Sequence, residues 1–181
     1  MLATRGDAAL SEKCYQSVVK ELAAKSPSEA AAFVEATDLP EEQKDQLSHQ
    51  VLGQWAENDP HQAFAAWAAL KEDVAPQPLL LAMDSWSVNS PGAEEAVEWV
   101  KQLDAGPARE QFKAHLIESM SQGERYAQAA DLGNTLADPQ ERIRHLKTVK
   151  REWEERFPKQ TGEWFAKLPE ADRRAIDGKL D

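Results

Sequence analysis

A repeat of about 33 residues, present five times, constrains this chain of 181 residues more than any other feature. Each copy is anchored by a large apolar residue, and the anchors are Leu22, Trp55, Trp86, Met120 and Trp153. Five residues after the anchor comes a proline in four copies (Pro27, Pro60, Pro91 and Pro158) and Arg125 in the other. Periods of this length are typical of arrays of helical hairpins, each of which stacks only on its neighbours.

The first helix of each repeat, helix A, is predicted from the residues that precede the anchor. Large apolar residues recur eight, four and three positions before it, and these offsets share one face of a helix. In the first repeat they are Cys14, Val18 and Val19, so Cys14 and Val18 are expected in the core. The five A helices are predicted to start near Asp7, Glu41, Pro76, Pro107 and Pro139.

The proline after the anchor is expected to open the second helix of each repeat, helix B. Proline suits the first helical position because its N–H is not needed there and its φ is already helical. Asn58-Asp59-Pro60 and Asn89-Ser90-Pro91 place a capping side chain just before it. The B helices are predicted at 27–37, 60–71, 91–103, 124–136 and 158–167. Their expected buried residues are Phe33, Val34, Phe64, Trp67, Val97, Trp99, Leu132, Trp164 and Phe165.

The resulting fold class is all-α, with no segment of strand-like alternation. We predict an α-solenoid of about five antiparallel helical hairpins, forming one domain over 1–181. The repeats are placed at 7–38, 39–72, 73–104, 105–137 and 138–168. A capping helix follows at 169–178, with Gly178 as its terminator.

The period and the two-helix unit resemble the tetratricopeptide repeat family, whose unit ends in a proline as at Leu39-Pro40 and Leu168-Pro169. The glycine–tyrosine pair of that family's first helix and the patterned alanines of its second are absent here, and a proline opening helix B is not part of its consensus. The phrase from Trp55 to Trp67 is also similar to helical repeats of many bacterial proteins without assigned activity. The resemblance implies a binding scaffold, by analogy of fold.

Composition narrows the class of partner. The net charge of −11 disfavours non-specific binding to nucleic acid and to anionic membranes. The longest apolar runs, such as 78–83, are too short to span a bilayer, and no signal peptide is evident, so the expected location is the cytoplasm. An exported fragment of a larger protein is the alternative.

The single cysteine, Cys14, excludes an internal disulfide and is interpreted as a small core residue.

We identify no catalytic, cofactor-binding or metal-binding residue in the sequence. His49, His61, His115 and His145 occupy different repeat positions and are interpreted as helix-surface or partly buried residues. Paired carboxylates such as Glu94-Glu95 lie near helix termini or on polar faces, where the helix dipole accounts for them. Enzyme activity is therefore not expected.

The fourth repeat departs from the pattern. It has neither tryptophan nor the proline, and it contains Gly123, Gly133 and Asn134, which are poor helix formers. We expect residues 121–136 to be the least stable part of the array. The six tryptophans of the other repeats are expected to pack in the core, so that replacing Trp55 or Trp153 by alanine costs about 3–5 kcal/mol.

Charge is distributed unevenly, with a net −12 over residues 1–135 and a net +1 over 136–181. Arg144, Lys147 and Arg151 share one helix face, with i,i+4 pairs expected for Lys150–Glu154 and Arg151–Glu155. These three cations and Tyr126 are the candidate partner-binding residues. The predicted function is that of a non-catalytic scaffold for a protein or peptide, with a basic partner segment favoured by the acidic repeats. The alternative is a nucleic-acid-binding repeat protein that uses the basic face of 142–151.

Overall fold

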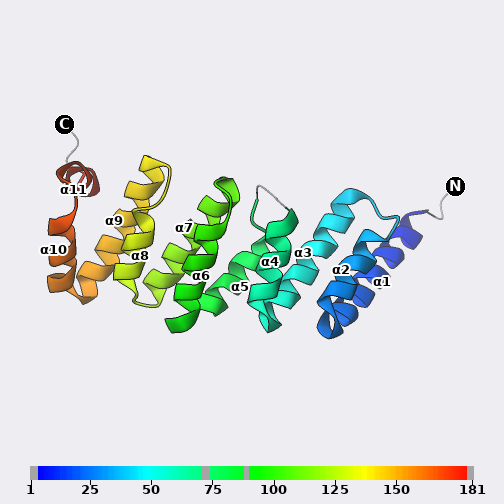
Figure 1. Ribbon diagram of the computed structural model, residues 1–181. Helices are drawn as coiled ribbons and strands as arrows, with labels where there is room; N and C mark the ends of the chain where they lie inside the picture. The colour runs from blue at the N-terminus through cyan, green and yellow to red at the C-terminus, as the bar shows by residue number, and fades with distance from the viewer. Residues whose placement is uncertain (1–3, 71–73, 88–89, 179–181) are drawn as a thin grey trace. The chain divides into compact units, whose positions relative to one another are not determined.

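A computed structural model describes residues 4–70, 74–87 and 90–178, and every element within them is an α-helix. The helices are packed against their neighbours and are labelled in Figure 1. Their bounds are α1 Thr4–Lys25, α2 Pro27–Glu35, α3 Glu41–Asn58, α4 Pro60–Leu70, α5 Gln77–Ser87, α6 Ser90–Gln102, α7 Pro107–Gln122, α8 Tyr126–Gly133, α9 Pro139–Arg156, α10 Pro158–Lys167 and α11 Glu170–Ile176. The all-α fold class is confirmed.

Helix starts follow the prolines, as predicted. Five helices (α2, α4, α7, α9 and α10) begin at a proline, where the missing N–H has no intrahelical partner to lose. The Asp59 side chain accepts a hydrogen bond from the Gln62 N–H at 3.1 Å and caps α4. Asp138 caps α9 in the same way and accepts from two successive backbone N–H groups. The predicted cap at Asn89-Ser90 and the predicted helical residue Lys71 lie outside the residues that can be described.

The helices form two compact units, and α5 contributes to both. The first unit comprises residues 4–70 and 76–82 of the described chain, and the second comprises 74–75, 83–87 and 90–178. The prediction of one repeat domain over 1–181 stays a prediction. No helix in the described ranges is both long enough and apolar enough to cross a lipid bilayer.

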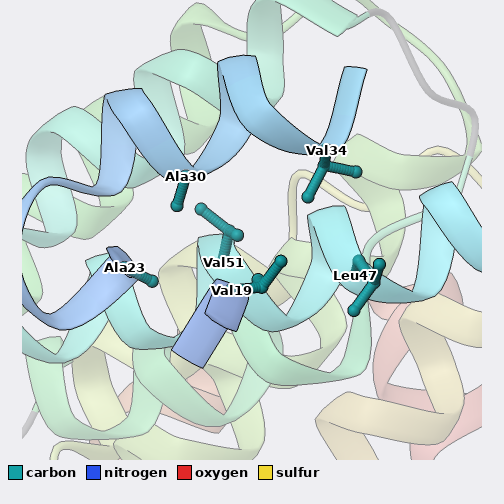
Figure 2. Close-up of a cluster of buried hydrophobic side chains, with 6 residues drawn as sticks. All are labelled: Val19, Ala23, Ala30, Val34, Leu47 and Val51. Atoms are coloured by element: carbon teal, nitrogen blue, oxygen red, sulfur yellow. The ribbon is translucent and has the colours of Figure 1, made fainter. Parts of the chain in front are cut away.

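In the first unit, α1 and α2 form a hairpin and α3 packs against both helices. Figure 2 shows the core that they share. Its side chains are all aliphatic, and alanine and valine predominate, which allows the three helices to approach closely: Val19, Ala23, Ala30, Val34, Leu47 and Val51. Helix α4 then packs on α3 and buries Phe64 and Trp67.

Two residues of α1 that were expected in the core are instead exposed. Cys14 is exposed, and 47% of Val18 is accessible to solvent. The corresponding residues of α3, Leu47 and Val51, are buried in the core shared with α1 and α2. The interpretation of Cys14 as a core residue is therefore wrong.

The second unit is built around α7 and α9. Helix α7 packs against α6, α8 and α9, and α9 packs against α8, α10 and α11. The fully buried side chains of these two central helices include Phe112, Leu116, Ile117, Leu146 and Val149. The last helix, α11, ends at the buried Ile176, and Gly178 follows its C-cap with a φ of +73°, a left-handed conformation that glycine adopts readily.

Aromatic rings pair within the second unit as the repeat pattern predicts. Trp86 lies beside Trp99, with ring centroids 6.3 Å apart, and Trp99 meets Phe112 edge-on at 5.1 Å. Trp153 lies 5.6 Å from Trp164. Burial is less complete than expected at six positions, which are only half-buried: Phe33, Trp55, Val97, Trp99, Trp164 and Phe165.

The glycines of the fourth repeat lie at helix ends and not within helices. Gly123 follows the last residue of α7 as its C-cap, and Gly133 is the last residue of α8. A Cβ added to Gly133 would stand 3.0 Å from the Leu146 side chain, so the missing side chain allows α8 to approach α9 closely. The mid-helix penalty assumed for these glycines does not apply.

Arg125 occupies the position of the missing proline and joins two helices. Its guanidinium donates a hydrogen bond to the Ser87 carbonyl oxygen at 2.9 Å. The Ser87 hydroxyl also hydrogen-bonds that of Ser119 at 2.7 Å, with either group as donor. Together they tie the end of α5 to α7 and to the start of α8. The residue before Arg125, Glu124, makes the turn with a φ of +59°.

Candidate functional site

The predicted basic residues lie on α9, and all three are exposed. Arg144, Lys147 and Arg151 follow one another along the helix surface, as expected from their spacing. Arg144 lines a groove between α7 and α9, whereas Lys147 and Arg151 line a shallower hollow beside Ile176 and Asp177. The structure therefore divides the three cations between two surfaces.

Acidic neighbours accompany most of the basic side chains of α9. Arg144 pairs with Glu141, and Arg142 lies 3.4 Å from Asp172 of α11. Lys150 reaches Glu154 at 3.0 Å, which confirms that predicted pair, and its Nζ also lies 4.8 Å from the centroid of the Phe165 ring.

Arg151 is paired differently from the prediction. Its partner is Glu152, at 3.7 Å, in place of Glu155. Neighbouring residues on a helix point in different directions, so this is a long contact between two exposed groups. The positive charge of the helix is substantially compensated by its own carboxylates.

Tyr126 does not belong to this surface. Only 4% of it is exposed, and its ring stacks on Trp153 with centroids 6.1 Å apart and planes 17° from parallel. Tyr126 opens α8, which packs against α9, so the ring is enclosed between the two helices. The side chain is part of the core, and its assignment as a partner-binding residue stays a prediction.

The groove between α7 and α9 contains a buried histidine. His145 is 5% exposed, and its Nε2 lies 3.8 Å from the Glu141 carboxylate. Burial lowers the pKa of His145 below its usual value of 6.5, and the neighbouring Arg144 lowers it further, whereas Glu118 and Glu141 oppose the shift. The groove has a volume of about 360 Å³ and carries charges of both signs, from Arg144, Glu118 and Glu152.

A second groove, which we call the acidic groove, lies between α6 and α8. Both helices pack on α7, and the space between them has a volume of about 460 Å³. Its floor is apolar and consists of Ala93 and Val97 from α6, Met120 from α7 and Leu132 from α8. The rim carries Glu94 and Glu98 on the α6 side and Asp131 on the α8 side. Lys101 also lines the groove and pairs with Glu98 at 2.6 Å.

The sequence alone did not identify the acidic groove. Glu94 was interpreted as part of a polar face near a helix start, and Val97 as a core residue. The i,i+4 spacing of Glu94 and Glu98 indicates that they share one face of α6, and this spacing predicts the α6 side of the rim. The α8 side comes from another repeat, so the rim exists only once α6 and α8 pack on the same helix.

In the first half of α7, the charge of the buried Lys113 is stabilised by polar partners. Lys113, 4% exposed, donates to Glu110 at 2.8 Å and to the Thr135 carbonyl at 2.9 Å. The other Glu110 oxygen accepts from the Ala137 N–H. Burial alone would raise the pKa of Glu110, but these hydrogen bonds, with the charges of Lys113 and Arg109, lower it. Buried charges need such partners, and here they tie α7 to the segment before α9.

In the described part of the chain, the side chains that could take part in catalysis or metal binding lie apart from one another. Within the described ranges, no three His, Cys, Asp or Glu side chains gather closely enough to hold a metal ion. His115 of α7 pairs with Asp84 of α5 at 3.0 Å. Comparison of the chain with protein-family models, with curated proteins and with solved structures found no match.

Proposed function

We propose that this protein is a non-catalytic helical-repeat scaffold that binds a protein or peptide. The proposal includes the tetratricopeptide-like organisation of about five hairpins as an α-solenoid with α11 as its cap. Support comes from the repeat position eight residues before each anchor, where Leu47, Phe112 and His145 are buried, Pro78 is half-buried and Cys14 is exposed. Arrays of this kind offer extended surfaces between their helices as binding sites.

The observation that carries the binding function is the acidic groove. It combines an apolar floor with charged side chains at its edge, and protein-binding surfaces have the same combination of apolar centre and polar rim. The groove is open and its walls are helices, which suits a segment of another macromolecule. The proposal assigns no catalytic residue, cofactor or metal, and it places the protein in the cytoplasm.

Affinity capture from a native lysate tests the proposal. The immobilised full-length chain should retain a protein in amounts comparable with its own, as judged by mass spectrometry. Recombinant partner should then bind the chain directly in a calorimetric titration. Retention of no protein above the level of a blank matrix would contradict the binding function.

Nucleic acid is the alternative ligand, through the basic face of 142–151. Arg142, Arg144 and Arg151 each lie beside a carboxylate, which leaves little uncompensated charge for phosphate. Binding to phosphates must show a steep loss of affinity with salt. A gel shift with DNA or RNA that disappears at raised salt would favour this alternative over a protein partner.

A further inference from the structure

Among the described residues that line the acidic groove, carboxylates outnumber cations. Glu94, Glu98 and Asp131 provide three carboxylates, and Lys101 is the one cation that lines it. The excess is smaller in the α7–α9 groove, whose lining includes Arg144 with two carboxylates, Glu118 and Glu152. A surface with an excess of negative charge favours positively charged partners and disfavours negatively charged ones.

The apolar floor of the acidic groove sets a second requirement for the molecule that binds there, besides its positive charge. Val97 is half-buried and lies between the two exposed carboxylates of α6, one turn of helix apart. Leu132 follows Asp131 directly and faces the same groove from α8. An occupant must therefore place apolar side chains at the centre and cationic side chains at both edges.

We infer that the acidic groove between α6 and α8 binds an amphipathic basic helix of a protein partner, with its apolar face on Val97 and its Lys or Arg side chains beside Glu94, Glu98 and Asp131. This inference rests on the proposed function and names the site and the chemical class of the partner. The mode of binding is the insertion of an amphipathic helix into an apolar groove. The carboxylates steer the partner and fix its orientation, whereas the floor supplies the buried apolar area.

The probe is a fluorescein-labelled synthetic peptide of about eleven residues, roughly three helical turns, with leucines on one face flanked by lysines. Two control peptides share its length. One carries glutamate in place of every lysine, and the other has the same composition in an order that breaks the apolar face. Fluorescence polarisation with the full chain should show binding of the basic amphipathic peptide and weaker binding of both controls.

Charge-reversal variants locate the site. Glu94→Lys/Asp131→Lys should weaken binding of the basic peptide by about tenfold or more, because two rim charges then repel it. The matched control, Glu155→Lys/Glu163→Lys, changes the net charge equally at exposed positions outside the groove and should leave the affinity within about twofold. The milder Glu94→Gln/Asp131→Asn keeps side-chain size and should give an intermediate loss. Circular dichroism checks that each variant keeps its helices.

The outcomes separate this inference from the proposed function. If the chain does not bind the basic amphipathic peptide, or if both charge reversals weaken binding equally, the inference is overturned. Lysate capture with Glu94→Lys/Asp131→Lys then shows whether the function survives, since a partner that is retained equally by this variant and by the wild type binds at a different surface. Loss of that partner in the variant alone supports both statements.

Discussion

Individual aromatic residues differ in how completely they are enclosed, and their contributions to stability should differ accordingly. Trp153 is 6% exposed and lies against Tyr126 on one side and Trp164 on the other. Trp55, at the same repeat position, is only half-buried. The equal contributions expected from the repeat pattern therefore do not follow from the structure.

Replacing Trp153 by alanine should lower the free energy of unfolding by about 3–5 kcal/mol, the range for deleting a large buried aromatic. Trp55→Ala should cost less, because part of that ring is already in water. Arg144→Ala, at an exposed position, should change stability by less than about 0.5 kcal/mol. Urea denaturation followed by circular dichroism measures all three. Equal losses at Trp55 and Trp153 would show that exposure does not set the difference.

His145 makes stability depend on pH. Its folded pKa lies below the usual 6.5, so the unfolded chain binds a proton more readily than the folded one. Its contribution is therefore fully present above pH 6.5 and is lost as the pH falls below this value toward the folded pKa. Wild-type stability should decline over this window, and His145→Gln, which cannot titrate, should decline less. Identical declines in the two proteins would mean that other groups cause the pH dependence.

At the scale of the element, helix starts were predictable because proline restricts φ at a fixed place in each repeat. The starts of α2, α3, α4, α7, α9 and α10 were predicted correctly. The exposure of Cys14 and Val18 could not be predicted from the repeat pattern, since it depends on what packs beside α1. The burial of Tyr126 was missed because its stacking partner, Trp153, belongs to the next repeat.

For α8, the sequence and the structure lead to different predictions of how fast its backbone amides exchange. The sequence suggests that 121–136 exchange amide hydrogens fastest, whereas in the structure Ala129, Ala130 and Leu132 are buried and both glycines lie at helix ends. Local opening follows low packing density, so we expect the hydrogen-bonded amides of α8 to be protected at least as well as those of α4. Hydrogen exchange followed by mass spectrometry decides the question. Faster exchange in α8 than in α4 would restore the interpretation of a weakened repeat.

For the whole molecule, secondary structure content is the first property to test. Helix accounts for 83% of the structure, and no strand occurs in the ranges it describes. Far-UV circular dichroism of the full chain should therefore give the spectrum of a protein that is at least about two-thirds helical. A substantial strand contribution would contradict both the repeat pattern and the fold.

The spread of a local perturbation tests whether the chain behaves as an array. Each hairpin of a repeat protein contacts only its neighbours, so stability is approximately a sum of unit terms and interface terms. Trp153 belongs to α9, which packs against α7, α8, α10 and α11. Trp153→Ala should therefore accelerate amide exchange in these helices and leave the α1–α3 core around Val19 and Val51 unchanged. Because α1–α3 form their own buried cluster, their protection serves as the internal control. Uniform acceleration along the chain would show a single cooperative domain and would contradict nearest-neighbour coupling.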